Sequence, residues 1–157
     1  VLETRNPVAI CYPSGGEGAY NVCCTSTLVA PGTDCTVVTY GTLYNNAAEA
    51  AAICGKKGVS VELIKLAAID TIDMDAICAS VQKTGHIIVV EETADHGCIA
   101  DAIFAALLSH GIAAKCARRN LGQRFHPQGT IAQLRAACGL DAESISNLIL
   151  EVTEHEA

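Results

Sequence analysis

Short β-rich runs alternate along this chain with segments of helical periodicity, and this alternation constrains the fold more than any other feature. Crossover connections between successive strands place helices on both faces of a largely parallel sheet. The runs that we expect to form strands are residues 34–40, 59–66, 86–92 and 112–117. The pattern therefore predicts an α/β fold built as a three-layer α/β/α sandwich.

Residues typical of the beginning and the end of a helix follow the expected strands. Asp73 is typical of an N-cap and Gly85 of a helix stop. Farther on, Thr130 and Gln133 have the spacing of a capping box for a short helix that ends at Gly139. A last helix is expected to begin after the capping residue at position 141. These signals divide the chain into repeated strand-and-helix units.

The first thirty residues do not follow this rhythm. Residues 7–13 are expected to form a short strand, residues 14–18 a loop, and residues 24–29 an additional edge strand. We interpret residues 1–30 as an arm that leads into the domain of residues 31–157. The chain begins without Met, as a fragment or a processed subunit does.

Composition excludes several classes of function. The 157 residues carry a formal net charge of -7, which disfavours binding to nucleic acid. No apolar run approaches the ~20 residues of a membrane span. The nine cysteines are odd in number and lack a C-x2-C pair. Reduced thiols in a cytoplasmic protein are the favoured interpretation, and we expect four of them to lie in the core: Cys35, Cys54, Cys78 and Cys116.

The loop after the third strand is the most chemically dense segment, because residues 91–98 contain three carboxylates, a histidine and a thiol. A metal site at His96 and Cys98 and a nucleophilic pair of the same residues are two open hypotheses. A structural interpretation is favoured over both. In it, Glu91 and Glu92 end a buried strand where the loop or a neighbouring subunit satisfies them, and Gly97 opens the next helix.

A second polar loop follows the fourth strand. Arg118, Arg119 and Arg124 are candidates for holding a carboxylate or a phosphate, although a solvated basic patch is favoured. His126 lies in a loop with Pro and Gly, where a histidine is more often solvated. The loop after Tyr40 has neither of the glycine patterns that wrap a phosphate, so a dinucleotide site is not expected.

Several segments taken together resemble a known family, the C-terminal domain shared by transketolases, 2-oxo acid dehydrogenase beta subunits and 1-deoxy-D-xylulose-5-phosphate synthases. The segments are GTDCTVVTYGT (32–42), GVSVELI (58–64) and IDMDAICASVQKTGHIIVVEE (72–92). Three further segments are similar to the deoxyxylulose-phosphate synthases in particular: PQGT (127–130), LRA (134–136) and GLDAESI (139–145). Residues 6–18, NPVAICYPSGGEG, look like the end of that family's pyrimidine-binding domain.

This resemblance implies a five-stranded sheet in which an antiparallel first strand joins four parallel ones. It also implies a parent enzyme that condenses pyruvate with glyceraldehyde 3-phosphate on thiamine diphosphate and magnesium. The domains that hold this cofactor precede the segment matched here. The chain alone is therefore expected to bind no cofactor or metal and to be inactive. Its expected partners are a second copy, or the missing thiamine-binding and pyrimidine-binding domains.

The chain departs from the family at three arginine positions, where it has Cys11, Ser14 and Ala67. The resemblance implies that two of these arginines grip the substrate phosphate. Losing two charge-assisted hydrogen bonds costs roughly 3–6 kcal/mol, so poor handling of a phosphorylated triose is expected. The candidates for the substrate entrance are Tyr12, Glu92, His96, Arg124 and His126.

Three hypotheses for function remain open from the sequence. The first is the C-terminal region of a thiamine-dependent transferase, which pairs subunits and shapes the substrate entrance. The second is a non-catalytic binding or assembly module that retains the fold. The third, a thiol-based redox protein built on Cys23 and Cys24 or on Cys98, is the least favoured.

Overall fold

The computed structural model describes residues 26–154, which contain five strands and five helices. The strands are β1 (Ser26–Ala30), β2 (Cys35–Tyr40), β3 (Val61–Leu66), β4 (His86–Val90) and β5 (Lys115–Arg119). The helices are α1 (Leu43–Lys56), α2 (Met74–Thr84), α3 (Ile99–Ser109), α4 (Ile131–Cys138) and α5 (Ala142–Glu154). The predicted alternation of strands and helices is confirmed.

One sheet joins the strands in the order β1-β3-β2-β4-β5. Strands β3, β2, β4 and β5 run parallel, and β1 pairs antiparallel with β3 at one edge. The expected α/β architecture with a mostly parallel sheet is therefore present. Because the four parallel strands share one direction, their carboxyl ends meet at a single edge of the sheet, which we call the carboxyl edge.

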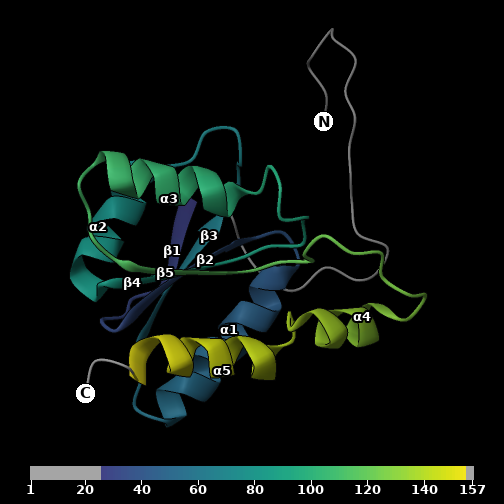
Figure 1. The fold of residues 1–157 in the computed structure, drawn as a ribbon. Helices are drawn as coiled ribbons and strands as arrows, with labels where there is room; N and C mark the ends of the chain where they lie inside the picture. Colours follow the sequence, from purple (N-terminus) through teal and green to yellow (C-terminus); the bar gives the residue numbers. More distant parts are fainter. Residues whose placement is uncertain (1–25, 155–157) are drawn as a thin grey trace, which may run out of the picture.

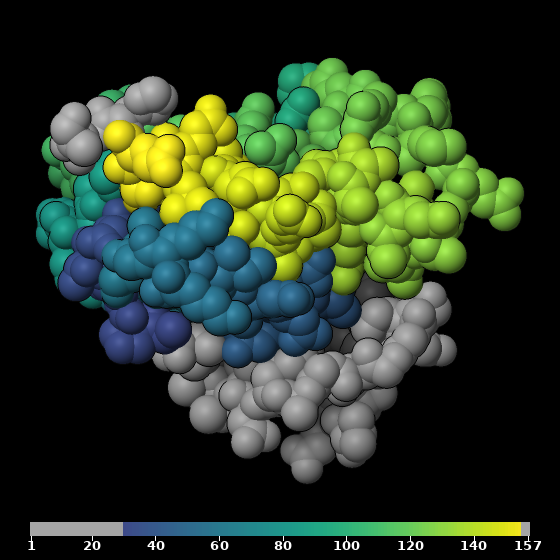
Figure 2. All heavy atoms as spheres, turned by 90° about the horizontal axis from the view of Figure 1, so that it is seen from below, coloured from purple at the N-terminus to yellow at the C-terminus, as the bar shows by residue number. Residues whose placement is uncertain are grey.

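Helices cover both faces of the sheet. Figure 1 shows α2 and α3 on one face and α1 and α5 on the other. Seen from the α1 side in Figure 2, α5 and α1 lie side by side, with α4 beyond one end of α5. The three central strands, β3, β2 and β4, are buried on both faces, which explains why their sequences are mostly apolar.

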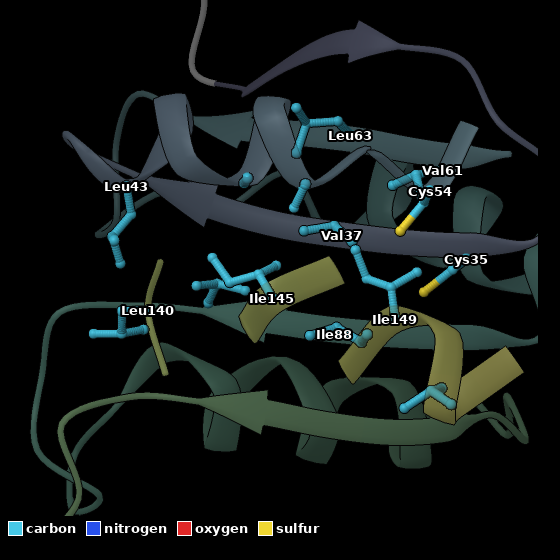
Figure 3. Close-up of a cluster of buried hydrophobic side chains, with 14 of the residues drawn as sticks. Cys35, Val37, Leu43, Cys54, Val61, Leu63, Ile88, Leu140, Ile145 and Ile149 are labelled. Atoms are coloured by element: carbon cyan, nitrogen blue, oxygen red, sulfur yellow. The ribbon is translucent and has the colours of Figure 1, made fainter. Parts of the chain in front are cut away.

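Apolar side chains of β2, β3 and β4 meet α1 and α5 in the larger of two core clusters. Figure 3 shows Val37 and Ile88 of the sheet close to Ile145 and Ile149 of α5, and Leu63 of β3 belongs to the same cluster. Residues on the opposite face of the same strands pack against α2 and α3. Because helices cover both faces, each strand residue packs against one of the two helix layers.

Several predicted strand limits were wrong by a few residues. β3 begins at Val61, not residue 59, and β4 ends at Val90, because Glu91 already bonds to α3. The fourth parallel strand is residues 115–119, not 112–117, because Ile112 donates a backbone hydrogen bond to Leu107 and closes α3. The edge strand ends at Ala30, not at residue 29, and its predicted start at residue 24 lies outside the described residues. The strand expected at residues 7–13 lies outside the described residues.

The predicted caps are confirmed. The Asp73 side chain accepts a hydrogen bond from the Ala76 amide at 3.1 Å, and Gly85 ends α2 in the left-handed conformation with φ of 71°. Thr130 and Gln133 form the predicted capping box of α4. These local side-chain bonds satisfy amides that the first helical turn leaves unpaired.

The predicted core thiols are confirmed at three of four positions. Cys35, Cys54 and Cys78 are free and buried. Burial raises the pKa of the Cys35 thiol to about 12. The expectation for Cys116 was wrong: this residue lies on β5, the outer strand of the sheet, and is exposed. Among the described residues, no helix has the length and apolar character that crossing a bilayer requires.

A close backbone approach at Gly32 generates a first prediction. A Cβ at this position would lie 2.2 Å from the backbone nitrogen of Glu62 and 2.2 Å from the carbonyl carbon of Val61. Because backbone atoms cannot move aside cheaply, we expect Gly32→Ala to lower the free energy of unfolding by about 1–3 kcal/mol or more. Urea unfolding measures this change.

Gly55→Ala is the matched control. Gly55 lies in α1, and nothing would contact its added methyl group within 4 Å. Alanine in a helix interior is favoured over glycine by about 0.5–1 kcal/mol, so this variant is expected to be more stable than the parent. Equal stability of the two variants would contradict the assigned approach of residue 32 to β3.

Candidate functional site

The loops at the carboxyl edge bring together most of the chemistry that the sequence singled out. The loop of residues 91–98 follows β4, and the loop of residues 120–130 follows β5. The Leu121 amide donates to the Thr93 carbonyl at 3.0 Å, and the Glu91 amide donates to the Arg119 carbonyl at 3.1 Å. The two loops are therefore fixed to each other by backbone hydrogen bonds.

Glu91 anchors this edge. Its side chain is fully buried, and it accepts hydrogen bonds from the amides of Ile99 at 3.0 Å and Ala100 at 3.1 Å. The Tyr40 hydroxyl donates to the same carboxylate at 3.1 Å. Burial, with the negative charge of Glu91 second, raises the pKa of Tyr40. The structural interpretation of Glu91 agrees with this geometry, because the following loop and helix satisfy its carboxylate.

The Glu92 side chain lies on the α1 side of the sheet and holds α4 in place. The Arg135 guanidinium donates to the Glu92 carboxylate at 2.7 Å and to the Thr42 hydroxyl at 2.6 Å. The Arg135 side chain is only 17% exposed. Nearby, the Asn46 side chain donates to the Leu140 carbonyl at 2.8 Å. A hollow of about 550 Å³ opens beside these residues, between α1, α4 and the start of α5.

His96 and Cys98 are not brought together as a pair. His96 is exposed, whereas Cys98 is buried as the N-cap of α3. Burial raises the pKa of the Cys98 thiol, and the Arg118 guanidinium lies 3.5 Å from its sulfur. Within residues 26–154, no group of three or more His, Cys, Asp or Glu side chains is arranged to hold a metal ion. Cys23 and Cys24 lie outside the described residues.

The three arginines do not converge on one ligand. Arg118 pairs with Asp101 of α3, whereas the Arg119 side chain lies against Gly139 in the opposite layer. Successive strand residues point to opposite faces, which separates these two side chains. Arg124 donates to the Ala137 carbonyl at 2.9 Å. The three arginines therefore do not form one site for a carboxylate or a phosphate, although Arg118 alone pairs with a carboxylate.

The expectation that His126 is merely solvated was also wrong. Its ring is partly buried, with Nε2 2.9 Å from the Leu121 carbonyl and Nδ1 3.4 Å from the sulfur of Cys138. Sequence reasoning missed Cys138 as a polar partner, because nothing in the spacing of residues 126 and 138 shows that the loop folds back onto α4. The only local signal was the histidine itself.

The proposed entrance residues therefore share an edge without forming one constellation. Glu92, His96, Arg124 and His126 all lie in its two loops. A shallow hollow of about 240 Å³ between these loops is lined by Ala94 and by residues 122–125, which include Arg124. Tyr12 lies outside the described residues.

The described part of this edge does not fit a diphosphate group. Glu91 already occupies the amino end of α3, and Arg118 and Arg135 are bound to carboxylates. A thiamine diphosphate site needs donors and magnesium ligands that are free to turn toward the ligand. These residues instead hold the protein's own loops.

Comparison with known proteins agrees with the fold. The family model for the transketolase C-terminal domain matches residues 25–145, which include the whole sheet and four of the five described helices. The chain belongs to the transketolase C-terminal domain family. The resemblance found in the sequence motifs is thus confirmed at the level of the family.

Several relatives of this transketolase C-terminal domain are longer proteins. A 1-deoxy-D-xylulose-5-phosphate synthase of Syntrophotalea carbinolica is 30% identical over 125 residues, covering 80% of this chain and 20% of the relative. The beta subunit of an acetoin:2,6-dichlorophenolindophenol oxidoreductase of Cupriavidus necator is 35% identical over 122 residues, covering 72% of this chain and 36% of the relative. A pyruvate dehydrogenase E1 beta subunit of Bacillus subtilis is 37% identical over 81 residues, covering 52% of this chain and 25% of the relative.

Among solved structures, a split-gene transketolase described as an inactive beta4 tetramer matches with a TM-score of 0.74 and 22% identity. The match covers 84% of this chain and 42% of that one. This likeness supports the fold. The chain spans between a fifth and about two fifths of the length of the relatives named here.

The anchoring of α3 by Glu91 generates a second prediction. In Glu91→Gln, one amide oxygen replaces two carboxylate oxygens, so at least one of the two α3 amides loses its acceptor. We expect the free energy of unfolding to fall by about 1.5–3 kcal/mol. Faster hydrogen exchange at Ile99 and Ala100 is expected to accompany this loss.

Glu92→Gln is the control, because the Glu92 side chain is 38% exposed and its ion pair is partly solvated. This change is expected to cost no more than about 1 kcal/mol. If Glu92→Gln proved the more damaging of the two substitutions, the role assigned to Glu91 would be wrong.

Proposed function

We propose that this chain is the C-terminal part of a thiamine-diphosphate-dependent transferase similar to 1-deoxy-D-xylulose-5-phosphate synthase or transketolase. In this role it takes part in subunit assembly and shapes the substrate entrance, and it is inactive alone. Residues 1–30 are the end of a pyrimidine-binding domain with a linker and first strand, and residues 31–157 are the C-terminal domain. Thiamine diphosphate and magnesium are held by the other domains, and the complete assembly works in the cytoplasm.

The observation that carries this proposal is the family match combined with the state of the carboxyl edge. The chain has the fold of the family, yet Glu91, Glu92 and their partners hold loops and helices in place. The inactive beta4 form of the split-gene transketolase supports the expectation that such a chain needs other domains for activity. The same likeness supports self-association of this chain.

The edge also offers positions for a substrate entrance. Glu92, His96, Arg124 and His126 lie in its two loops, and Ala67 is exposed directly after β3. Tyr12 completes the proposed set from the sequence. An entrance built from loops on a rigid sheet is the usual arrangement in open α/β folds.

A non-catalytic assembly module is the second candidate function. The observation that favours it is the replacement of the two arginines expected to grip a phosphate, by Ala67 among the described residues and by Cys11 in the sequence. Such a module keeps the fold and its partners without supporting turnover of a phosphorylated acceptor.

Reconstitution tests the proposed function. Alone, the chain is expected to sediment as a self-associated species without ketol transfer. Mixed with chains that carry the thiamine-binding and pyrimidine-binding domains, it is expected to enter a larger complex and to restore transfer from pyruvate to an aldehyde. Sedimentation velocity and a product assay measure both outcomes. Absence of any complex refutes the proposal, and a complex without turnover supports the assembly module instead.

The position of Ala67 generates a further prediction for the reconstituted complex. Ala67→Arg restores a guanidinium where the resemblance implies a phosphate contact. One charge-assisted hydrogen bond contributes about 1.5–3 kcal/mol, so kcat/KM for glyceraldehyde 3-phosphate is expected to rise roughly 10- to 100-fold. The value for unphosphorylated glyceraldehyde is expected to stay constant.

Ala113→Arg is the matched control. Ala113 is also exposed, but it precedes β5 and so lies at the opposite edge of the sheet. The substitution adds the same charge without approaching the proposed entrance. The preference for glyceraldehyde 3-phosphate over glyceraldehyde is therefore expected to stay unchanged. An equal effect of both substitutions would attribute the gain to net charge and would remove residue 67 from the entrance.

A further inference from the structure

Cys138 and His126 form a thiol–imidazole pair that the family fold does not explain. His126 lies in the loop after β5, and Cys138 is the last residue of α4. The sulfur of Cys138 is 3.4 Å from Nδ1 of His126. Twelve residues separate the two in the sequence, and the return of the loop onto α4 brings them into contact.

A third group fixes the orientation of the imidazole. Nε2 of His126 lies 2.9 Å from the Leu121 carbonyl oxygen. A carbonyl can only accept, so Nε2 must carry the hydrogen. In the neutral ring, Nδ1 then has a lone pair, and this lone pair faces the thiol. A base adjacent to a thiol and oriented by a third group is the arrangement that activates cysteine nucleophiles.

Two arginine side chains contact the residues on either side of Cys138. The Arg124 guanidinium donates to the carbonyl of Ala137, the residue before Cys138. The Arg119 side chain lies against Gly139, the residue after it. Guanidinium groups near a cysteine stabilise negative charge that develops on sulfur. The other buried thiols on α2 and at the start of α3 have no imidazole partner among their described contacts.

We propose that Cys138 is a peroxide-reactive thiol for which His126 accepts the proton. In this step Nδ1 takes the thiol proton, and the sulfur attacks one oxygen of hydrogen peroxide. The S–O bond forms as the O–O bond breaks, and the departing hydroxide takes the proton from the imidazolium to leave as water. The sulfur is oxidised to a sulfenic acid and the peroxide is reduced.

The chain contains a matched internal reference for this reactivity. Cys78 is 9% exposed and Cys138 is 8% exposed, so access is nearly equal. Burial raises the pKa of the Cys78 thiol, and the negative charge of Asp75 raises it further. Any large difference in reactivity between the two cysteines must therefore come from the groups around them.

Peroxide oxidation followed by trapping with dimedone tests the proposal on the 157-residue chain. Peptide mass spectrometry then measures the trapping rate at each cysteine separately. We expect Cys138 to react roughly tenfold or more faster than Cys78 in the folded protein. In urea, where no pair is formed, the two rates are expected to converge. Equal rates in the folded protein would overturn the proposal.

His126→Gln separates chemical assistance from access. Loss of the base is expected to slow trapping at Cys138 to the rate at Cys78, whereas a loop that merely shielded the thiol would yield faster trapping. Cys35 and Cys54 are fully buried and report folding, because they stay unlabelled in an intact core. An unchanged or increased rate at Cys138 with those thiols protected would contradict the role of His126. If the variant unfolds, the ratio of the trapping rates at Cys138 and Cys78 in the parent chain decides whether the proposal holds.

Discussion

The buried carboxylate of Glu91 is the interaction on which the arrangement of the carboxyl edge depends. Directly after β4, it accepts two amide hydrogen bonds from the first turn of α3 and one from Tyr40. An unpaired carboxylate at this depth is costly, so the loop of residues 91–98 must return over the strand end. That return brings Thr93 to Leu121 and fixes the second loop.

The polar groups near Glu91 are divided between the two faces of the sheet. Glu92 and Arg135 hold α4 on the side of α1, while Arg118 pairs with Asp101 on the side of α3. From the sequence, a structural role was favoured for Glu91 and Glu92 and a solvated basic patch for Arg118, with ligand sites as the less favoured hypotheses. In three dimensions the carboxylates and the arginines pair with one another.

Features set by neighbouring residues were predictable, and features set by distant contacts were not. The caps at Asp73 and Thr130 depend on amides three residues away, so spacing alone reveals them. The buried strands were equally clear from their apolar runs. The register of β5 and the contact of His126 with Cys138 depend on how whole loops return, and no local pattern encodes them. The exposure of Cys116 likewise follows from the position of β5 in the sheet.

The central claim is that the polar groups of this chain hold its own structure and leave cofactor binding to other domains. Isothermal titration of thiamine diphosphate and magnesium into the 157-residue chain tests it most directly. The account predicts only heats of dilution for the chain alone, and saturable uptake once chains that carry the other two domains are added. Stoichiometric, tight uptake by the chain alone would contradict it.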